Sequence, residues 1–290
     1  MKCPVNIEKL YNDYIQVKYE ENYEERYEGK EKYYHASSSG FCSRKNYFSS
    51  VEQVEATNPT NELSNRVLRL GTIVHEDLEV CIRKLQGRQI LEDEKKESSS
   101  TIYSNTIDSN TEDSNTNHSK EKEIPYFQKE ILNERFDFHI EKEILLEEFN
   151  VRGFYDLVAV SKHDGGVYLI DFKTMASFSW SRKFGTKYFD TNPSQHQEIQ
   201  LATYGLYIRK EFGRLDGMFL YYYNKDTSRM KAVEVPMAML KRAENYWTNI
   251  NNEHKKGLPM FREGASPVQD WECKYCRFLD HCNPPFFKKK

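Results

Sequence analysis

The chain of 290 residues is long enough for one sizeable domain or two small ones. Its residues are 38% hydrophobic and 14% aromatic, which is enough to build a core and excludes a globally disordered chain. The 42 Lys and Arg residues against 45 Asp and Glu residues leave a net charge of −3, so any contact with a polyanion must come from a local basic patch.

The composition also bears on where the protein works. The sequence has no apolar run of about 18 residues, the least that a membrane-spanning helix needs. The first residues, MKCPVNIEKL, lack an apolar stretch and a cleavage site, so we expect an intracellular protein, cytoplasmic or nuclear, and not a secreted one. The six cysteines are too few for a disulfide framework, and cysteines that cluster in sequence then indicate a metal site.

Three regions are expected along the chain. Residues 1–70 would form an N-terminal helical region, in which HASSSGFCSRKNYF indicates a short helix that carries Cys42. Residues 71–265 would form the central domain, and residues 266–290 a cysteine-rich tail. A long helix crosses the first boundary, because apolar residues recur at helical spacing from Leu63 to Ile82.

Residues 91–123 differ in character from the rest of the chain. Ser, Asn, Thr and acidic residues dominate this tract, and the tripeptide SNT recurs three times. Such a composition has little to bury, so we expect a disordered insertion. The acids of the tract exceed its bases by five, which leaves the remaining residues with a net charge of +2.

Strands and helices alternate irregularly after the insertion. FHIEKEILLEEF, VRGFYDLVAV, GVYLIDFKT and RLDGMFLYYYN predict strands, and the turn SKHDGG joins the second and third into a hairpin. PSQHQEIQLATYGLYIRKEFG and MAMLKRAENYWTNINNEHKKG predict helices. The sequence therefore predicts an α/β fold with a mixed central β-sheet flanked by helices.

The hairpin brings two carboxylates together. Antiparallel partners across the turn have residue numbers that sum to about 328, which places Asp156 opposite residue 171 or 172. Asp171 and Lys173 are two residues apart and project from one face of their strand. These charges would need a compensating cation, and hard oxygen ligands suit Mg²⁺ or Mn²⁺. Taken alone, the residues also fit a surface strand with an Asp–Lys ion pair.

Other residues could join this pair. Glu143 is a candidate third carboxylate, because it alternates with Ile144 along the preceding strand. His75 lies among apolar positions of the long helix, where a packed histidine is the alternative to a ligand. Gln200 and Tyr204 are four residues apart and share one face of a helix, which also fits an ordinary half-buried seam.

Taken together, these segments resemble the PD-(D/E)XK nuclease superfamily in its RecB-like and Cas4-like branch. The resemblance rests on His75 in GTIVHE, Asp156 in GFYD, Asp171-Phe172-Lys173, and Gln200 followed by Tyr204, and it spans residues 71–204. It implies a restriction-endonuclease-like core that cleaves DNA phosphodiesters with Mg²⁺ or Mn²⁺.

The resemblance also implies a role for each residue. Lys173 would orient the attacking water or help to deprotonate it, while Gln200 and Tyr204 would position Lys173 or the phosphate. The metal ligands would be His75, Asp156, Asp171, the backbone carbonyl of Phe172, and Glu143. The catalytic residues would be Asp156, Asp171, Lys173, Gln200 and Tyr204.

Four cysteines at two ends of the sequence form a second pattern. Cys273, Cys276 and Cys282 have the spacing C-x₂-C-x₅-C, and Cys42 is a lone upstream partner. By spacing alone, four thiolates fit either Zn²⁺ or an iron–sulfur cluster. The resemblance to Cas4-like and AddB-like nucleases implies a [4Fe–4S] cluster that ties the helical N-terminal region to the tail, with Zn²⁺ as the alternative.

A segment rich in aromatic and basic residues follows Lys173. Its aromatic faces could stack on unpaired bases while its cations follow the phosphates, or its aromatic residues could simply pack on the core. The candidate DNA-binding residues are Trp180, Arg182, Lys183 and Lys187.

These features lead to a functional expectation. We expect an exonuclease acting on single-stranded DNA or free DNA ends, with protein partners in a repair, recombination or CRISPR-adaptation complex. A structure-specific endonuclease, a non-catalytic subunit that binds DNA ends, and a zinc-stapled nucleic-acid-binding module are the alternatives.

Overall fold

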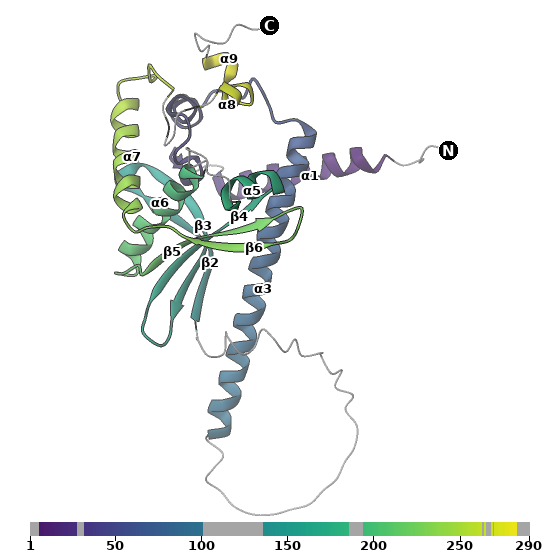
Figure 1. Cartoon of the computed structure of the whole chain (residues 1–290), viewed down its shortest axis with the longest axis vertical. Coiled ribbons are helices and arrows are strands. Elements are labelled where there is room, and N and C mark those ends of the chain that lie inside the picture. The colour runs from purple at the N-terminus through teal and green to yellow at the C-terminus, as the bar shows by residue number, and fades with distance from the viewer. Residues whose placement is uncertain are drawn as a thin grey trace, which may run out of the picture.

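The structure is a computed structural model, and it describes residues 6–27, 32–100, 136–185, 194–262, 264, 268 and 270–282. Within these residues, a six-stranded mixed sheet lies between helices, as the sequence predicts (Figure 1). The strands are β1 (Tyr34–His35), β2 (Phe136–Leu146), β3 (Val151–Ser161), β4 (Val167–Met175), β5 (Gly217–Asn224) and β6 (Met230–Glu234).

The helices precede, connect and follow these strands. The longer ones are α1 (Ile7–Tyr27), α3 (Glu62–Ser100), α5 (Ser177–Phe184), α6 (Gln195–Glu211) and α7 (Met239–His254). The short ones are α2 (Ser43–Asn46), α8 (Asp270–Lys274) and α9 (Leu279–Cys282), together with the single turns η1 (Ala36–Ser38), η2 (Tyr47–Glu52) and η3 (Glu147–Phe149).

The central strand β3 determines where the other strands lie. β2 pairs antiparallel with the whole length of one edge of β3, from Val151 to Ser161. On the other edge, β4 pairs antiparallel only with residues 157–160, and β1 pairs parallel only with residues 151 and 152. β5 then continues the sheet parallel to β4, and β6 pairs antiparallel with β5. Residues 153–156 of β3 therefore face a gap in the ladder.

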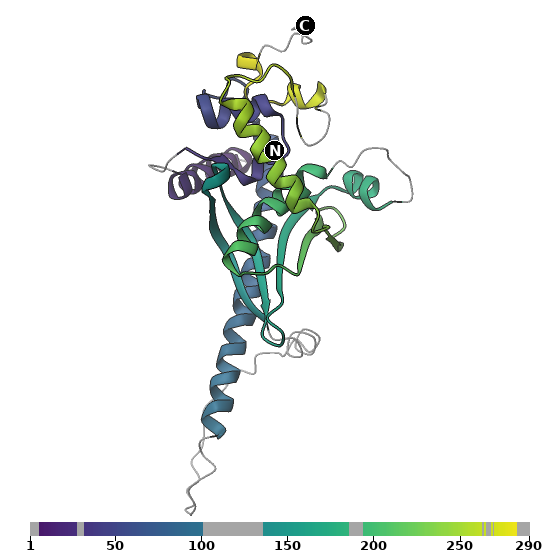
Figure 2. The ribbon, with the colours of Figure 1, turned by 90° about the vertical axis from the view of Figure 1, so that its left-hand side faces the viewer.

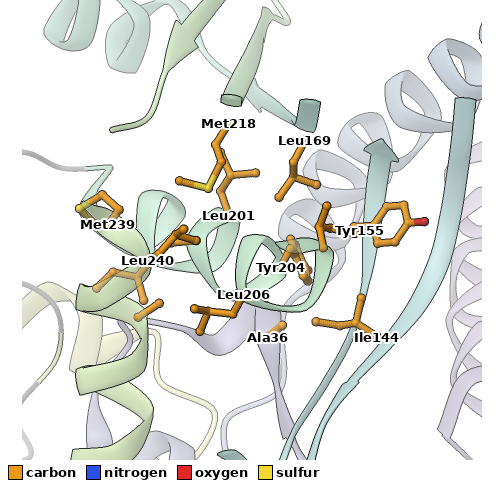
Figure 3. Packing of buried hydrophobic residues seen from close by; sticks show 14 of the residues in the cluster. Ala36, Ile144, Tyr155, Leu169, Leu201, Tyr204, Leu206, Met218, Met239 and Leu240 are labelled. Carbon is orange, nitrogen blue, oxygen red and sulfur yellow. The ribbon is translucent and has the colours of Figure 1, made fainter. Parts of the chain in front are cut away.

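The main core lies between the sheet and the pair α6 and α7. Leu201, Tyr204 and Leu206 of α6 pack there against Leu169 of β4 and Met218 of β5, among other buried side chains (Figure 3). Burying this many large apolar side chains is the principal favourable contribution to the stability of the fold.

Helix α6 approaches its neighbours closely at Gly205. A Cβ atom there would lie 2.7 Å from the Met218 sulfur and 2.8 Å from a methyl group of Leu240. Nearby, the fully buried Trp247 of α7 donates a hydrogen bond to Thr203 Oγ1 over 2.9 Å. The small residue and the buried hydrogen bond together explain how α6 and α7 can pack tightly on one face.

The opposite face of the sheet is covered by α3. Leu78 and Ile82 of this helix pack against a smaller cluster formed by Ile140, Leu157 and Phe172. Figures 1 and 2 show the later part of α3 extending beyond the sheet. Phe172 thus points into this smaller cluster, and the larger core lies on the face that Asp171 and Lys173 share with Leu169.

The predicted elements agree with the structure in most places. The hairpin is confirmed, with partners Leu157↔Ile170 and Val160↔Val167, whose numbers sum to 327. The segment after Lys173, for which the sequence analysis names no helix or strand, forms a helix over residues 177–184. Helix α3 also continues to Ser100, so residues 91–100 of the predicted insertion are helical; residues 101–123 lie outside the described residues.

The continuation of α3 through residues 91–100 follows from their composition. The first residues of the tract, LEDEKKE, are mostly strong helix formers, so a preceding helix continues through them at little cost. No helix in the part of the chain that the structure describes has both the length and the apolar character needed to cross a bilayer.

Candidate active site

The gap in the ladder between β3 and β4 is occupied by the side chain of Asp156. The pairing of these strands stops at Leu157↔Ile170, and at the next position Asp156 Oδ2 accepts a hydrogen bond from the backbone N–H of Phe172 over 2.6 Å. The carboxylate thus replaces a backbone acceptor, which holds it rigidly where the strands part.

Asp156 also contacts His75 of α3. The Nδ1 atom of His75 lies 3.5 Å from Asp156 Oδ2, and the imidazole packs edge-on against the ring of Phe172. Burial opposes ionisation of both groups, but their mutual attraction outweighs it. As a result, the pKa of Asp156 is lowered and the pKa of His75 is raised.

Asp171 forms the second half of the site with Lys173. The side chain of Asp171 is only 2% exposed, and the Lys173 ammonium lies 2.5 Å from its Oδ2 atom. Burial and then the negative charge of Asp156 raise the pKa of Asp171 to about 6, against the attraction of Lys173. The two carboxylates therefore have opposite pKa shifts, which is typical of a functional site.

The donor set fits a divalent cation at one particular atom. Oδ2 of Asp171 is buried in an ion pair with the Lys173 ammonium, and the pKa of Asp171 stays raised despite this attraction. A buried carboxylate oxygen in this state is costly, and a hard cation would compensate it. No group of three or more His, Cys, Asp or Glu side chains is already arranged to hold a metal ion within the described ranges.

A cavity of about 800 Å³ opens beside Asp156 and His75. It lies between α1, α3 and strands β2 and β3, and Glu79, Glu141 and Glu143 are part of its lining. Burial, followed by the charges of Glu141 and Asp156, raises the pKa of Glu79 to about 7. Asp171 and Lys173 are not among the residues that line this cavity.

Two glutamates of β2 lie near Asp156: Glu143, the candidate from the sequence, and Glu141. Glu143 is 38% exposed and forms an ion pair with Arg152. Glu141 has a φ of +48° and falls between residues 140 and 142, which pair with Leu157 and Tyr155, so it lies opposite Asp156. Glu79 and the backbone irregularity at Glu141 were missed, although Glu79 follows His75 by one helical turn.

Gln200 and Tyr204 contact each other as their spacing predicts. The Gln200 amide donates a hydrogen bond to the Tyr204 hydroxyl over 3.1 Å. Tyr204 is buried in the main core, and it also reaches the cavity beside Asp156. The position of α6 therefore determines where these two side chains lie relative to the cavity.

The candidate DNA-binding residues of α5 occupy different environments. Trp180 is half-buried against Phe184, with 4.7 Å between ring centroids. Lys183 lies over the ring of Tyr222 at 4.9 Å, and Arg182 is exposed beside Phe178. Lys187 lies outside the described residues.

All four predicted cysteine ligands line one cavity of about 180 Å³. Burial raises the pKa values of the Cys42 and Cys276 thiols, and the charges of Cys273 and Cys282 raise both further. The four cysteines do not form a group of three or more side chains arranged to hold a metal ion in the part of the chain that is described. Cys81 is exposed on α3 and is not part of this cavity, and Cys3 lies outside the described residues.

Two arginines donate hydrogen bonds to these sulfur atoms. Arg44 Nε reaches Cys282 Sγ at 3.2 Å, and Arg262 Nη1 reaches Cys273 Sγ at 2.8 Å. Arg44 also donates to the backbone carbonyls of Cys282 and Pro259. Two N–H donors directed at sulfur would stabilise thiolates, so the donor set fits a thiolate-bound metal group.

Comparisons with known proteins agree with this geometry. Residues 35–283 match the PD-(D/E)XK nuclease superfamily. No curated protein matches the chain.

Two solved structures are also similar. SSO0001 has 16% identity and a TM-score of 0.44, and the match covers 96% of this chain and 98% of that chain. A protein from Eubacterium rectale, named only provisionally as an exonuclease, has 19% identity and a TM-score of 0.33; the match covers 52% of this chain and 54% of that chain. The family match spans most of the sequence, so the chain belongs to the PD-(D/E)XK nuclease superfamily.

Proposed function

We propose that the protein is a divalent-metal-dependent deoxyribonuclease that hydrolyses DNA phosphodiesters at the point where β3 and β4 part. The observation that carries the proposal is the pair of carboxylates at this point: Asp156 is held by His75 and by the N–H of Phe172, and Asp171 is buried in an ion pair with Lys173. Membership of a nuclease superfamily supports the same reaction.

Some of the residues at this point would bind the metal ion, and Lys173 would act on the attacking water. Asp156, Asp171 and His75 would hold Mg²⁺ or Mn²⁺, with the backbone carbonyl of Phe172 and a glutamate of β2 as further ligands. Such an ion, when bound, polarises the phosphate and lowers the pKa of water. The N–H of Phe172 and the imidazole of His75 fix the orientation of Asp156, so that its carboxylate needs no rearrangement during reaction.

Lys173 would act on the attacking water and on the phosphate. Its ammonium is held beside Asp171, where it can orient a water molecule and offset the charge that develops on the phosphate oxygens. Gln200 and Tyr204 act through position, because their mutual hydrogen bond fixes the face of α6 that lies against the site.

The cavity of the four cysteines would hold a [4Fe–4S] cluster, with Zn²⁺ as the alternative. Four thiols that line one cavity, with arginine donors on two of them, support a thiolate-bound group. The group would join the segment around Cys42 to the tail. Asn58 already donates to the backbone carbonyls of Lys274 and Cys276, so the two segments meet through the protein itself.

Within this reaction class we favour an exonuclease that acts on single strands or free ends, in DNA repair, recombination or CRISPR adaptation. A structure-specific endonuclease and a non-catalytic end-binding subunit are the alternatives. The aromatic and basic residues of α5, which follow directly after the strand of Lys173, support a substrate with unpaired bases.

The test is incubation of 5′- and 3′-labelled DNA with the purified chain and Mg²⁺ or Mn²⁺, with a chelator as control. We expect metal-dependent cleavage by the wild type and none by Asp171→Ala, which should still bind DNA. Cleavage of linear but not circular single strands identifies an exonuclease. Cleavage by Asp171→Ala that still depends on metal would contradict the assignment of the site.

A further inference from the structure

A chain of contacts connects the Lys173 side of the candidate active site with the cysteine cavity. Tyr222 of β5 is the ladder partner of Lys173, and its hydroxyl donates a hydrogen bond to Gln197 in the first turn of α6 over 2.7 Å. The neighbouring His196 stacks on Phe41 with 5.2 Å between ring centroids. Phe41 in turn lines the cysteine cavity.

Two lysines lie along this series of contacts. Lys183 of α5 lies 4.9 Å from the centre of the Tyr222 ring, and Lys45 lies 4.5 Å from the centre of the Phe41 ring. Neither forms an ion pair with an acid in the described residues, and each is only half-exposed. Cations held on aromatic rings and left unneutralised can bind an anion.

The pKa of His196 depends on the charges of these lysines. Burial and then the charges of Lys173, Lys183 and Lys45 lower its pKa to about 4. The three ammonium groups come from β4, α5 and α2, so their common effect on one imidazole depends on the tertiary fold. Burial lowers the pKa of Lys183, and the charge of Glu198 in the first turn of α6 opposes this effect.

The other side of Asp156 has the opposite charge. The 800 Å³ cavity there is lined by Glu76, Glu79, Glu141 and Glu143, of which Glu76 pairs with Arg69 and Glu143 with Arg152. Carboxylates repel a phosphodiester backbone unless cations intervene, whereas the side with Lys173, Lys183 and Lys45 attracts it. The N-terminus of α6 adds the positive end of a 17-residue helix to the same side.

From this arrangement we propose that Lys45, Lys183 and the first turn of α6 form a phosphate-binding track, which carries the DNA strand between Lys173 and the cysteine cavity. The inference rests on the proposed nuclease function and adds the path of the substrate. Figures 1 and 2 agree with it, because α5 lies at the end of the sheet that is nearer to α8 and α9. The bases would face outward, where Phe178 of α5 is 74% exposed.

The track also connects the cysteine cavity with the candidate active site. Lys45 lies in the short helix α2, three residues after Cys42, the N-cap residue of that helix. A metal group bound by Cys42 would therefore fix the position of Lys45 and, through Phe41, the contact with His196. The cysteine cavity then serves substrate binding as well as the stability of the fold.

The experiment measures binding of a short fluorescent single-stranded DNA to the full chain, in chelator, over a range of salt concentrations. Lys45→Gln and Lys183→Gln should each weaken binding several-fold at low salt. Each should also reduce the slope of log Kd against log salt by about 0.7, the value for one phosphate contact on a single strand. In the double variant the slope should fall by about twice the value for one phosphate contact, and Lys45→Arg should retain wild-type binding.

Lys162→Gln is the matched control, because Lys162 lies in the turn between β3 and β4, where it pairs with Asp137. It should leave both the affinity and the slope unchanged. A second arm titrates inorganic phosphate into protein with labelled histidine, where the NMR signal of His196 should shift in the wild type and stay fixed in the double variant.

The outcomes separate the two proposals. If the wild type cleaves DNA but the double variant keeps the same slope and affinity, the track is refuted and the nuclease function stands. A wild type that neither binds nor cleaves DNA refutes the nuclease function, and the track, which rests on that function, is then refuted as well. A phosphate-induced shift of His196 that persists in the double variant would likewise refute the track.

Discussion

The replacement Asp171→Asn should stabilise the metal-free protein while abolishing its response to metal. Asparagine keeps the shape of the side chain but removes the charge. In the wild type, burial and the charge of Asp156 raise the pKa of Asp171 from 3.8 to about 6. A shift of about two units corresponds to roughly 3 kcal/mol, and this much stability is lost on ionisation.

The sign of the effect follows from the direction of the shift. Because the folded state holds the proton of Asp171 more tightly than the unfolded chain does, the stability of the wild type falls as the pH rises from about 4 through about 6. The carboxylate is 2% exposed, so solvent screens this cost very little. Asp171→Asn should therefore be more stable than the wild type by about 2–3 kcal/mol above pH 7, with the difference vanishing near about pH 4.

The assay is urea unfolding of the two proteins in chelator, at about pH 5 and about pH 7.5, followed by the same measurement in Mg²⁺ or Mn²⁺. Metal should stabilise the wild type at the higher pH, by an amount that grows with metal concentration, and should not stabilise the variant. The reasoning is refuted if Asp171→Asn is destabilised at both pH values, or if metal stabilises it as much as the wild type.

Three other predictions concern the surroundings of the site. Tyr204→Phe removes the acceptor of the Gln200 amide, so steady-state kinetics should show a several-fold lower kcat with little change in KM, and an unchanged kcat would contradict the positioning role. Cys276→Ala should lose bound iron or zinc by elemental analysis and lower Tm, whereas Cys81→Ala, an exposed cysteine outside the cavity, should do neither; equal metal content in both variants would contradict the assignment. Gly205→Ala should cost about 1–3 kcal/mol in urea unfolding, because the added methyl group would overlap side chains of β5 and α7, and a neutral result would show that α6 can move.

Local pattern was sufficient to predict the hairpin and the principal helices. Alternating apolar residues and the turn SKHDGG set the register of β3 and β4, so the proximity of Asp156 and Asp171 could be predicted to within one residue. The contact between Gln200 and Tyr204 follows equally from the helical repeat.

Other features depend on contacts that no local pattern encodes. The positive φ of Glu141 interrupts the alternation of β2 and could not be predicted from the pattern that led to Glu143, whose role as a ligand stays a prediction. Residues 177–184 form a helix whose first backbone N–H, that of Ser177, donates a hydrogen bond to Asp226 of the β5–β6 turn. Lys45 and Lys183 come together around His196 only through the tertiary fold.

The most direct test of the central claim is the rate of phosphodiester hydrolysis by the wild type and by Asp171→Asn, measured side by side at saturating Mn²⁺ on the same single-stranded DNA. Our account predicts turnover by the wild type that stops on chelation, and a loss of at least about a hundredfold in the variant. Equal rates for the two proteins, or hydrolysis by the wild type that continues in chelator, would contradict it.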